Sequence, residues 1–370
     1  MTGRSSTVNA HMTATYSKSE QAPAEETITD LGNNVIRMQL PIQMPGLQHV
    51  NMYGLIDNRG LAIIDVGVPG PHTWKAVQKR IKDAGFKITD VHTVIVTHSH
   101  PDHFGCAGRL AVEANAQLVT HNNFRTFWNG NQAHNCNHGD TDMAHDDSLP
   151  EGNPFAEPIP WNGESREQMR PPLGRRLMFR FMRSGIIFGN YKLPEPARRV
   201  RTGDVLRLAG RDMFAVHTPG HTLDHLCIHD PEGGVVFTGD HVLPHITPYI
   251  SGIASGSNPL LDYFASLERT AQLADVETAL PAHGIVIENP AQRCKEIIEH
   301  HEERFDRLRK GSLELGKPAT VRELSTFLFR EDKIGHMADG ECYAHLEFLR
   351  QAGRAEVSID KSIKRYEVTG

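Results

Sequence analysis

Four potential metal-binding side chains occur within six residues of this chain, and this spacing restricts the fold more than any other feature. The four are His98, His100, Asp102 and His103. They follow directly after the continuous β-branched run DVHTVIVT, which predicts a buried central strand. His98 and His100 are two residues apart, so an extended backbone directs both side chains to one side. Four ligands exceed what one tetrahedral ion with an open catalytic position takes from a single loop, so we expect two ions to share it.

Three further candidate ligands lie where later predicted strands run into loops. They are His221 in Thr-Pro-Gly-His-Thr, Asp240 in Thr-Gly-Asp-His and His283 in Pro-Ala-His-Gly. Strand ends hold loops rigidly, so chemically active side chains often gather there. Imidazole and carboxylate groups suit zinc and also iron or manganese. The sequence therefore predicts two metal ions as cofactors, with zinc as the first choice and iron or manganese as the alternatives.

The order of predicted elements is that of a mixed α/β chain. Runs at 35–42, 50–57 and 61–67 are rich in β-formers and predict an antiparallel meander. The pattern at 71–84 predicts a helix that Gly85 ends. A strand, a helix and a strand follow at 90–97, 104–116 and 117–121. Four more strands are expected between residues 204 and 242, a helix over 259–273, a strand over 277–284 and a long helix from Pro290.

The ordered motifs HxHxDH, TPGHT, TGD and PAHG resemble the signature of the metallo-β-lactamase superfamily, over roughly residues 34–300. The resemblance implies an αββα sandwich, in which two β-sheets pack face to face with helices outside. It implies that the first metal is bound by His98, His100 and His221, and the second by Asp102, His103 and His283. Asp240 would bridge the two ions. Asp65, in LAIIDVG, matches a position that supports the ligand loop from behind.

Two metal ions a few ångströms apart can bridge one water and lower its pKa from about 15.7 toward about 7. The resulting hydroxide would attack a carbonyl carbon or a phosphorus, and Asp102 or Asp240 would handle the proton. Our leading hypothesis is hydrolysis of an acyl bond (thioester, ester or lactone) in a small organic substrate. The alternative is an endoribonuclease or other phosphodiesterase. A third hypothesis, a winged-helix regulator with a degenerate hydrolase domain, is disfavoured by the complete ligand set.

Composition divides the chain into three regions. Residues 1–26 are rich in Ser, Thr, Glu and Ala and predict a disordered leader. Residues 27–300 form the expected catalytic domain. Residues 301–370 read as helix, helix and hairpin and resemble the winged-helix appendage of lactamase-β-like hydrolases. This last region carries 13 basic and 13 acidic residues, which disfavours nucleic acid as a partner and favours packing or a homo-oligomer.

An irregular insertion of about residues 122–201 interrupts the catalytic domain and predicts a lid. Arg180 and Arg183 stand among apolar residues there, which suits an anionic acyl substrate; an ordinary amphipathic helix would show the same pattern. His134, Cys136 and His138 also lie in the insertion, with a spacing that matches no metal site we can name. Outside it, His241 and His245 neighbour the expected ligands and are candidates for contacts behind the ligands or with substrate.

The cysteines and the apolar runs indicate the compartment. Five scattered cysteines without a CxxC pair argue against a disulfide framework and favour a reducing compartment. No apolar run approaches the roughly 18–20 residues that span a bilayer. The N-terminus lacks the apolar segment of a secretory signal. We expect a cytoplasmic protein, and its formal net charge of −6 gives no basic field that would attract nucleic acid.

Overall fold

The larger of two central sheets carries the predicted meander. The computed structural model describes residues 18–44, 46–126, 161, 191–252 and 258–370. The meander consists of β2 (Val35–Met44), β3 (Leu47–Asp57) and β4 (Gly60–Ile64), which pair antiparallel as predicted. β5 (Val91–Ile95), β6 (Gln117–His121) and β7 (Arg198–Val200) then add in parallel, and β1 (Thr29–Asp30) pairs with β2. The sheet is thus seven-stranded, in the order β1 to β7.

The smaller sheet has five strands in the order β12-β11-β10-β9-β8. Its members are β8 (Val205–Leu208), β9 (Arg211–His217), β10 (Leu226–Asp230), β11 (Val235–Gly239) and β12 (Thr278–Pro281). All five overlap the runs that the sequence predicted as strands. Neighbouring strands are antiparallel except for β11 and β12, which run parallel, so the carboxyl ends of these two lie at the same edge.

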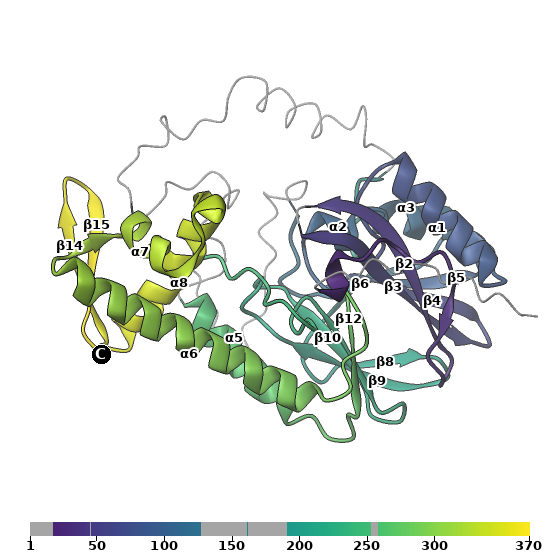
Figure 1. Ribbon diagram of the computed structural model, residues 1–370. Coiled ribbons are helices and arrows are strands. Elements are labelled where there is room, and N and C mark those ends of the chain that lie inside the picture. The colour runs from purple at the N-terminus through teal and green to yellow at the C-terminus, as the bar shows by residue number, and fades with distance from the viewer. Residues whose placement is uncertain (1–17, 45, 127–160, 162–190, 253–257) are drawn as a thin grey trace, which may run out of the picture.

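Side chains alternate across the strands and divide the core into layers. Ile63 of β4 packs in an outer cluster with Val77 of α1 (Pro71–Asp83) and Leu110 of α3 (Ala107–Ala114). The next residue, Ile64, packs instead against Phe237 of the other sheet. This period of two is what a strand buried on both faces requires. The predicted helix–sheet–sheet–helix arrangement follows, with α5 (Pro259–Ala271) and α6 (Pro290–Leu315) on the outer face of the smaller sheet (Figure 1).

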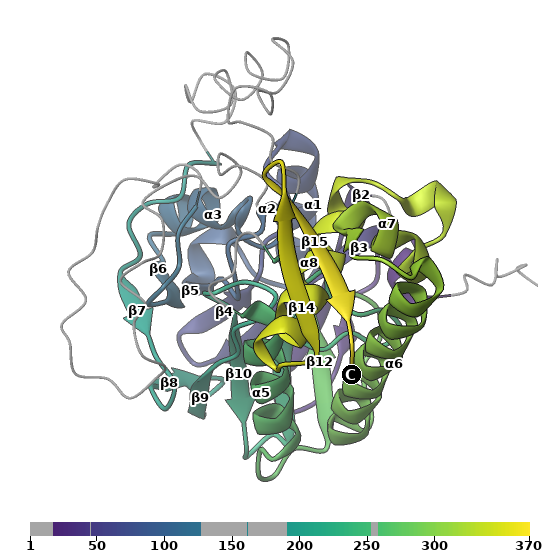
Figure 2. The same cartoon turned by 90° about the vertical axis from the view of Figure 1, so that its left-hand side faces the viewer.

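The C-terminal region contains the two helices and the hairpin that the sequence predicted. They are α7 (Val321–Leu328), α8 (His336–Gln351), β14 (Ala355–Asp360) and β15 (Ile363–Val368), with β13 (Ala319–Thr320) pairing on β15. Helix α6 runs through residue 300 without a break and leads to this region (Figure 1). Leu346 of α8 and Phe305 of α6 share one core with Val236 of the smaller sheet. The C-terminal elements therefore pack against α5 and α6. Figure 2 shows the β14–β15 hairpin toward the viewer, with α6 beside it.

The end of the expected leader differs from the prediction. Residues 18–26 lie on the domain, and a 3-10 helix covers Ser19–Gln21. Glu20 is fully buried, and its carboxylate accepts hydrogen bonds from the backbone amides of His245 (2.8 Å) and Ile246 (3.3 Å). Arg80 of α1 donates to the carbonyl of Glu25 at 2.9 Å. A polar composition did not reveal this segment because hydrogen bonds, and not apolar burial, hold it in place.

Most of the predicted insertion lies outside the described residues, together with Arg180, Arg183, His134, Cys136 and His138. In the described part of the chain, the cysteines Cys106, Cys227, Cys294 and Cys342 are free. Two further 3-10 helices cover Ile88–Asp90 and Glu331–Lys333. None of the helices placed by the structure combines the length and apolar character that a bilayer span needs.

Candidate metal centre

Both sheets contribute to one cluster of histidine and aspartate side chains at the edge where their strands end. His98 to His103 follow β5, with the short helix α2 (Pro101–Phe104) turning the chain within the loop. His221, Asp240 and His283 follow β9, β11 and β12 of the smaller sheet. Parallel pairing brings the carboxyl ends of β11 and β12 together, which accounts for the meeting of Asp240 and His283.

The first group consists of His98, His100, His221 and Asp240. Nδ1 of His100 lies 3.0 Å from Nε2 of His98 and 3.0 Å from Nε2 of His221. Oδ2 of Asp240 lies 3.9 Å from Nε2 of His98 and 3.6 Å from Nε2 of His221. Two nitrogen ligands about 2.0–2.1 Å from a tetrahedral zinc ion are separated by about 3.3 Å. The spacing of these atoms matches one coordination sphere.

The second group consists of Asp102, His103 and His283. Oδ2 of Asp102 lies 3.6 Å from Nε2 of His103 and 3.5 Å from Nε2 of His283. Asp240 also faces this group, with Oδ2 at 3.5 Å from Nε2 of His103 and Oδ1 at 3.3 Å from Nε2 of His283. Asp240 is thus the carboxylate that lies within 4 Å of both groups.

Three buried atoms of this cluster have no hydrogen-bond partner among the described residues. They are Nε2 of His103, Nε2 of His283 and Oδ1 of Asp240. Burying a polar atom without a partner costs about 1–3 kcal/mol, so several such atoms facing one point need compensation. A metal ion satisfies nitrogen and carboxylate lone pairs together. The residues present therefore fit metal ions.

The charge states also suit metal binding. Burial lowers the pKa of His100 to about 3, and burial likewise holds the pKa of His98 well below its usual value, so both rings are neutral. Burial acts to raise the pKa of Asp240, but His283 and His103 outweigh it and bring that pKa well below the usual range. Asp240 is therefore ionised at neutral pH. Neutral imidazole and ionised carboxylate are the forms that coordinate metal. In the second group, burial acts to lower the pKa values of His103 and His283, but Asp240 and Asp102 outweigh it and raise both, so a metal ion bound there would displace a proton from each ring.

Asp65 is hydrogen-bonded to the loop that carries His98 to His103. Its carboxylate accepts hydrogen bonds from Nδ1 of His103 (2.8 Å), from the Thr97 hydroxyl (2.8 Å) and from the Thr97 amide (2.9 Å). The Thr97 hydroxyl in turn accepts from Nδ1 of His98 at 3.1 Å. The backbone of Asp65 has φ of +57°, a left-handed conformation that Asp and Asn tolerate better than most residues.

Two other histidines of the cluster donate their outer ring nitrogen to a backbone carbonyl. Nδ1 of His221 donates to the carbonyl of Tyr249 at 2.8 Å, and Nδ1 of His283 donates to the carbonyl of His49 at 2.6 Å. Metal-ligating histidines almost always donate their second nitrogen in this way, which fixes the ring and the tautomer. With His98 and His103, four of the five histidines in the two groups follow this pattern.

Sequence reasoning missed His225, which touches three parts of the cluster. Its Nε2 accepts from the backbone amide of Asp240 at 3.1 Å, and its Nδ1 donates to the Thr218 hydroxyl at 2.8 Å. Its ring stacks on that of His98, with centroids 5.0 Å apart. Burial, the largest cause, holds the pKa of His225 well below its usual value, so the ring is neutral and can accept that amide. Its place four residues after His221, at the start of a predicted strand, was the available signal.

His241 and His245, which the sequence offered as neighbours of the site, point elsewhere. His241 is buried against α5, where its Nε2 lies 3.0 Å from the Thr270 hydroxyl. His245 is largely exposed, and its Nδ1 lies 3.0 Å from the Ser19 hydroxyl and 3.4 Å from the Glu20 carboxylate. These contacts hold the N-terminal segment and α5 in place.

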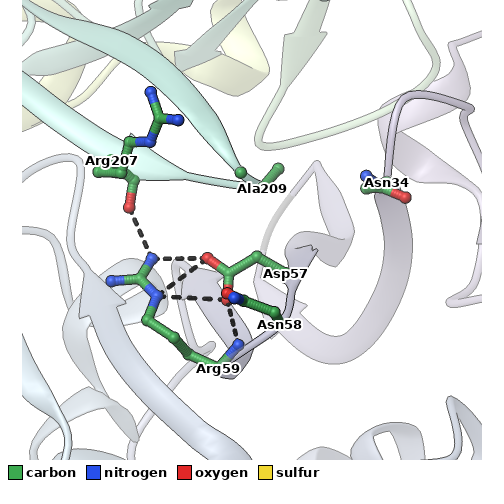
Figure 3. Close-up of a pocket in the computed structure, with 7 residues that line it drawn as sticks. Asn34, Asp57, Asn58, Arg59, Arg207 and Ala209 are labelled. Carbon is green, nitrogen blue, oxygen red and sulfur yellow. Dashed lines mark hydrogen bonds and ion pairs between the residues drawn. The ribbon is translucent and has the colours of Figure 1, made fainter.

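A polar cavity of about 480 Å³ lies between the β3–β4 and β8–β9 turns (Figure 3). These turns are at the end of β4 opposite Asp65, so the cavity lies away from the histidine cluster. Arg59, in its wall, donates to the Asp57 carboxylate and to the Arg207 carbonyl (2.7 Å). Its guanidinium is thus engaged by the protein, and the chemistry of the molecule is concentrated at the other end.

Comparison with known proteins assigns residues 45–283 to the family described as "Metallo-beta-lactamase superfamily". The lactamase-like protein vrtG of Penicillium aethiopicum is 37% identical over 111 residues, which are 30% of this chain and 34% of that protein. The atrochrysone carboxyl ACP thioesterase of Aspergillus fumigatus is 35% identical over 112 residues, 30% of this chain and 33% of that protein. Each of these matches spans about a third of the curated relative.

Two solved structures resemble most of the chain. A metallo-beta-lactamase family protein from Thermus thermophilus is 25% identical with a TM-score of 0.66, and the match covers 92% of this chain and 100% of that one. A beta-lactamase domain protein from Burkholderia ambifaria is 24% identical with a TM-score of 0.67, covering 94% and 96%. At this identity the second likeness concerns the fold alone. Both matches extend over most of the C-terminal region as well as the sandwich.

Proposed function

This chain belongs to the metallo-beta-lactamase superfamily, and on that premise we propose that it is a dinuclear metal-dependent hydrolase that cleaves a thioester, ester or lactone bond of a small organic substrate. One observation carries the proposal. Asp240 faces both ligand groups, and buried atoms of Asp240, His103 and His283 that have no hydrogen-bond partner among the described residues lie within 3.5 Å of one another or of the second Asp240 oxygen. A shared carboxylate between two ligand sets is the arrangement that a two-metal site uses.

We propose that the first ion is held by His98, His100 and His221, the second by Asp102, His103 and His283, and that Asp240 bridges them. Zinc is the first choice because the set combines imidazoles with carboxylates, and iron or manganese would also accept it. When bound, such ions lower the pKa of a coordinated water from about 15.7 to about 7 and polarise the substrate carbonyl.

The protein side of the reaction is positioning and proton transfer. Asp102 and Asp240 are ionised, so Oδ2 of Asp102 or Oδ1 of Asp240 can accept the proton released as water adds to the carbonyl and return it to the leaving group. Asp65 holds His103, and through Thr97 it holds His98, in the orientation that turns Nε2 inward. His225 fixes the backbone of Asp240.

The substrate class is supported by the relatives and not by the metal ligands. The Aspergillus fumigatus relative is named as a thioesterase acting on an acyl carrier protein. An acyl thioester therefore stands first among the acyl substrates. We further propose that residues 301–370 are a winged-helix domain that packs on the catalytic domain, since the order helix, helix, hairpin agrees with that architecture.

Elemental analysis of gently purified protein tests the metal centre. We expect about two ions per chain, mainly zinc. A metal-free preparation that is fully active would contradict the proposal.

A hydrolysis panel tests the substrate class, with acyl thioesters, lactones, nitrocefin and RNA. We expect turnover of acyl thioesters, and turnover of RNA alone would favour the phosphodiesterase alternative.

Arg180→Ala and Arg183→Ala should raise KM more than they lower kcat if these residues bind an anionic group, since loss of ground-state binding has that kinetic form. Unchanged kinetics on every substrate would remove these two arginines from the substrate site.

A further inference from the structure

The C-terminal helix α8 contacts the loop around Tyr249, whose carbonyl accepts a hydrogen bond from His221. Helix α8 lies after residues 45–283, the region matched to the family. We infer that α8 positions His221 through Tyr249, so that the C-terminal region is a working part of one metal subsite. The inference rests on the proposed metal assignment and extends it to residues beyond position 283.

The chain of contacts begins at the ligand. Nδ1 of His221 donates to the carbonyl of Tyr249 at 2.8 Å. Tyr249 lies in a segment without helix or strand, so neighbouring elements must fix its carbonyl. The next residue, Ile250, is fully buried in the core that also contains Tyr343 and Leu346 of α8. Helix α8 therefore supplies part of the surface that holds this loop.

Two glycines allow the loop and the helix to approach closely. The amide of Gly252 donates to the carbonyl of Gly340 at 3.3 Å. A Cβ atom on Gly252 would lie 2.7 Å from Cδ1 of Tyr343 and 2.9 Å from the amide nitrogen of Ala344, so a side chain does not fit there. Glycine is unfavourable inside a helix, and the contact with the loop gives a reason for Gly340 within α8.

The Tyr249 side chain makes the second contact with α8. A Cβ atom on Gly340 would collide with the Tyr249 hydroxyl oxygen, whereas the next atom of that ring, Cζ, is 3.7 Å away at an ordinary contact distance. The hydroxyl alone would therefore clash with an added methyl group. On the same face of α8, Tyr343 lies against Trp161, a residue of the predicted insertion, with ring centroids 4.8 Å apart.

The other ligand group has a different support. Nδ1 of His283 donates to the carbonyl of His49, and His49 contacts Ala22 and Gly284. None of these hydrogen bonds, all within the described part of the chain, involves α8. A disturbance of α8 should therefore weaken the subsite of His98, His100 and His221 and spare that of Asp102, His103 and His283.

Gly340→Ala tests the inference in the full-length protein, freed of metal and titrated with Co²⁺. The visible absorption of Co²⁺ depends on its ligands, so a subsite with three histidines gives a different spectrum from one with two histidines and Asp102. We expect the first subsite to bind Co²⁺ about 10- to 100-fold more weakly, the usual loss when a contact behind a ligand is removed, and the second to keep its affinity. Gly335→Ala is the matched control, because nothing lies within 4 Å of an added Cβ at that end of the same helix.

Removal of the hydroxyl provides the rescue. The double variant Tyr249→Phe/Gly340→Ala should bind Co²⁺ as Tyr249→Phe does, since the methyl group then meets only an ordinary contact. Gly252→Ala disturbs the same interface from the loop side and should show the same selective loss. Unchanged Co²⁺ binding by Gly340→Ala and Gly252→Ala, or equal weakening of both subsites, would overturn the inference. A wild-type protein that binds no Co²⁺ would instead contradict the proposed function.

Discussion

The two ligand groups share Asp240 but are supported from opposite ends of the chain. His221 is held through Tyr249 by the C-terminal helix α8, and His283 is held through His49, which donates to the carbonyl of Ala22 near the N-terminus. The matched family region spans residues 45–283 and contains all seven candidate ligands. Ala22 and α8 lie outside that region. The candidate ligands thus lie within the family match, while part of their support lies beyond it.

Substitution of Asp240, which faces both ligand groups, should weaken metal binding at both groups alike. Asp240→Asn keeps the shape of the side chain but removes the charge that offsets the repulsion between two ions. We expect turnover to fall on the order of 10²-fold or more, with weaker binding of both ions. Steady-state kinetics and elemental analysis measure the two effects. Near-normal turnover with two ions retained would show that Asp240 does not bridge.

Loss of the Asp65 charge should act mainly on the group that contains His103. Asp65→Asn tolerates the φ of +57°, so the backbone is preserved while the acceptor for Nδ1 of His103 is weakened. We expect metal affinity at this subsite to fall by about 100-fold. The melting temperature of the metal-free protein should change less than that of the metal-bound protein. Co²⁺ titration of wild type and variant measures the affinity. Because Thr97 links Asp65 to His98, an equal loss at both subsites would mean that this path dominates.

Disruption of the N-terminal support should weaken the His283 side alone. His49 donates from Nδ1 to the Ala22 carbonyl (2.7 Å) and accepts from the Gly284 amide (3.0 Å). We expect His49→Ala to lower metal affinity at that subsite on the order of 10-fold, less than Asp65→Asn, because the carbonyl that His283 contacts is retained. His72→Ala, on the exposed surface of α1, is the control. A loss confined to the His221 subsite would show that His49 supports His221 and not His283.

Acid should weaken the C-terminal support through a buried histidine pair. Nδ1 of His301 lies 2.9 Å from Nε2 of His345, and burial lowers the pKa of His345 to about 3. Its unfolded value is about 6.5, so the unfolded chain binds more protons between these values, and stability falls as the pH drops below about 6.5. We expect His345→Gln to make this decline shallower, by at most about 1.4 kcal/mol per pH unit. Urea unfolding at several pH values measures the slope. An unchanged slope would show that His345 does not contribute.

Local signals and motif spacing sufficed to predict the strands of the sandwich and the seven side chains that meet at their ends. The strands before His98, Asp240 and His283 are short β-rich runs. Because active side chains often lie where strands end, their meeting could be predicted without knowing the tertiary fold. The supports could not be predicted in the same way. The carbonyls of Tyr249 and His49 carry no sequence signal, because any residue supplies a carbonyl.

Residues 18–26 and α6 show a second reason. The N-terminal segment is polar, so its composition suggested disorder. Glu20 is nevertheless buried, and its carboxylate accepts a hydrogen bond from the loop at His245. Helix α6 was expected from its pattern, but the core that it shares with both the smaller sheet and α8 depends on contacts distant in sequence. Contacts of that kind depend on the tertiary fold, and periodicity does not reveal them.

Each ligand group draws on both sheets, with His98 to His103 following the larger sheet and His221, Asp240 and His283 following the smaller one. Ions bound there would act as crosslinks between two halves of the polypeptide. Like any ligand of the native state alone, they would add stability that grows with free metal concentration. Metal loading can be completed only after the two sheets have docked, so it would report a late step of folding. A chelator would remove these crosslinks, and its effect on protease sensitivity should be strongest along the seam between the sheets.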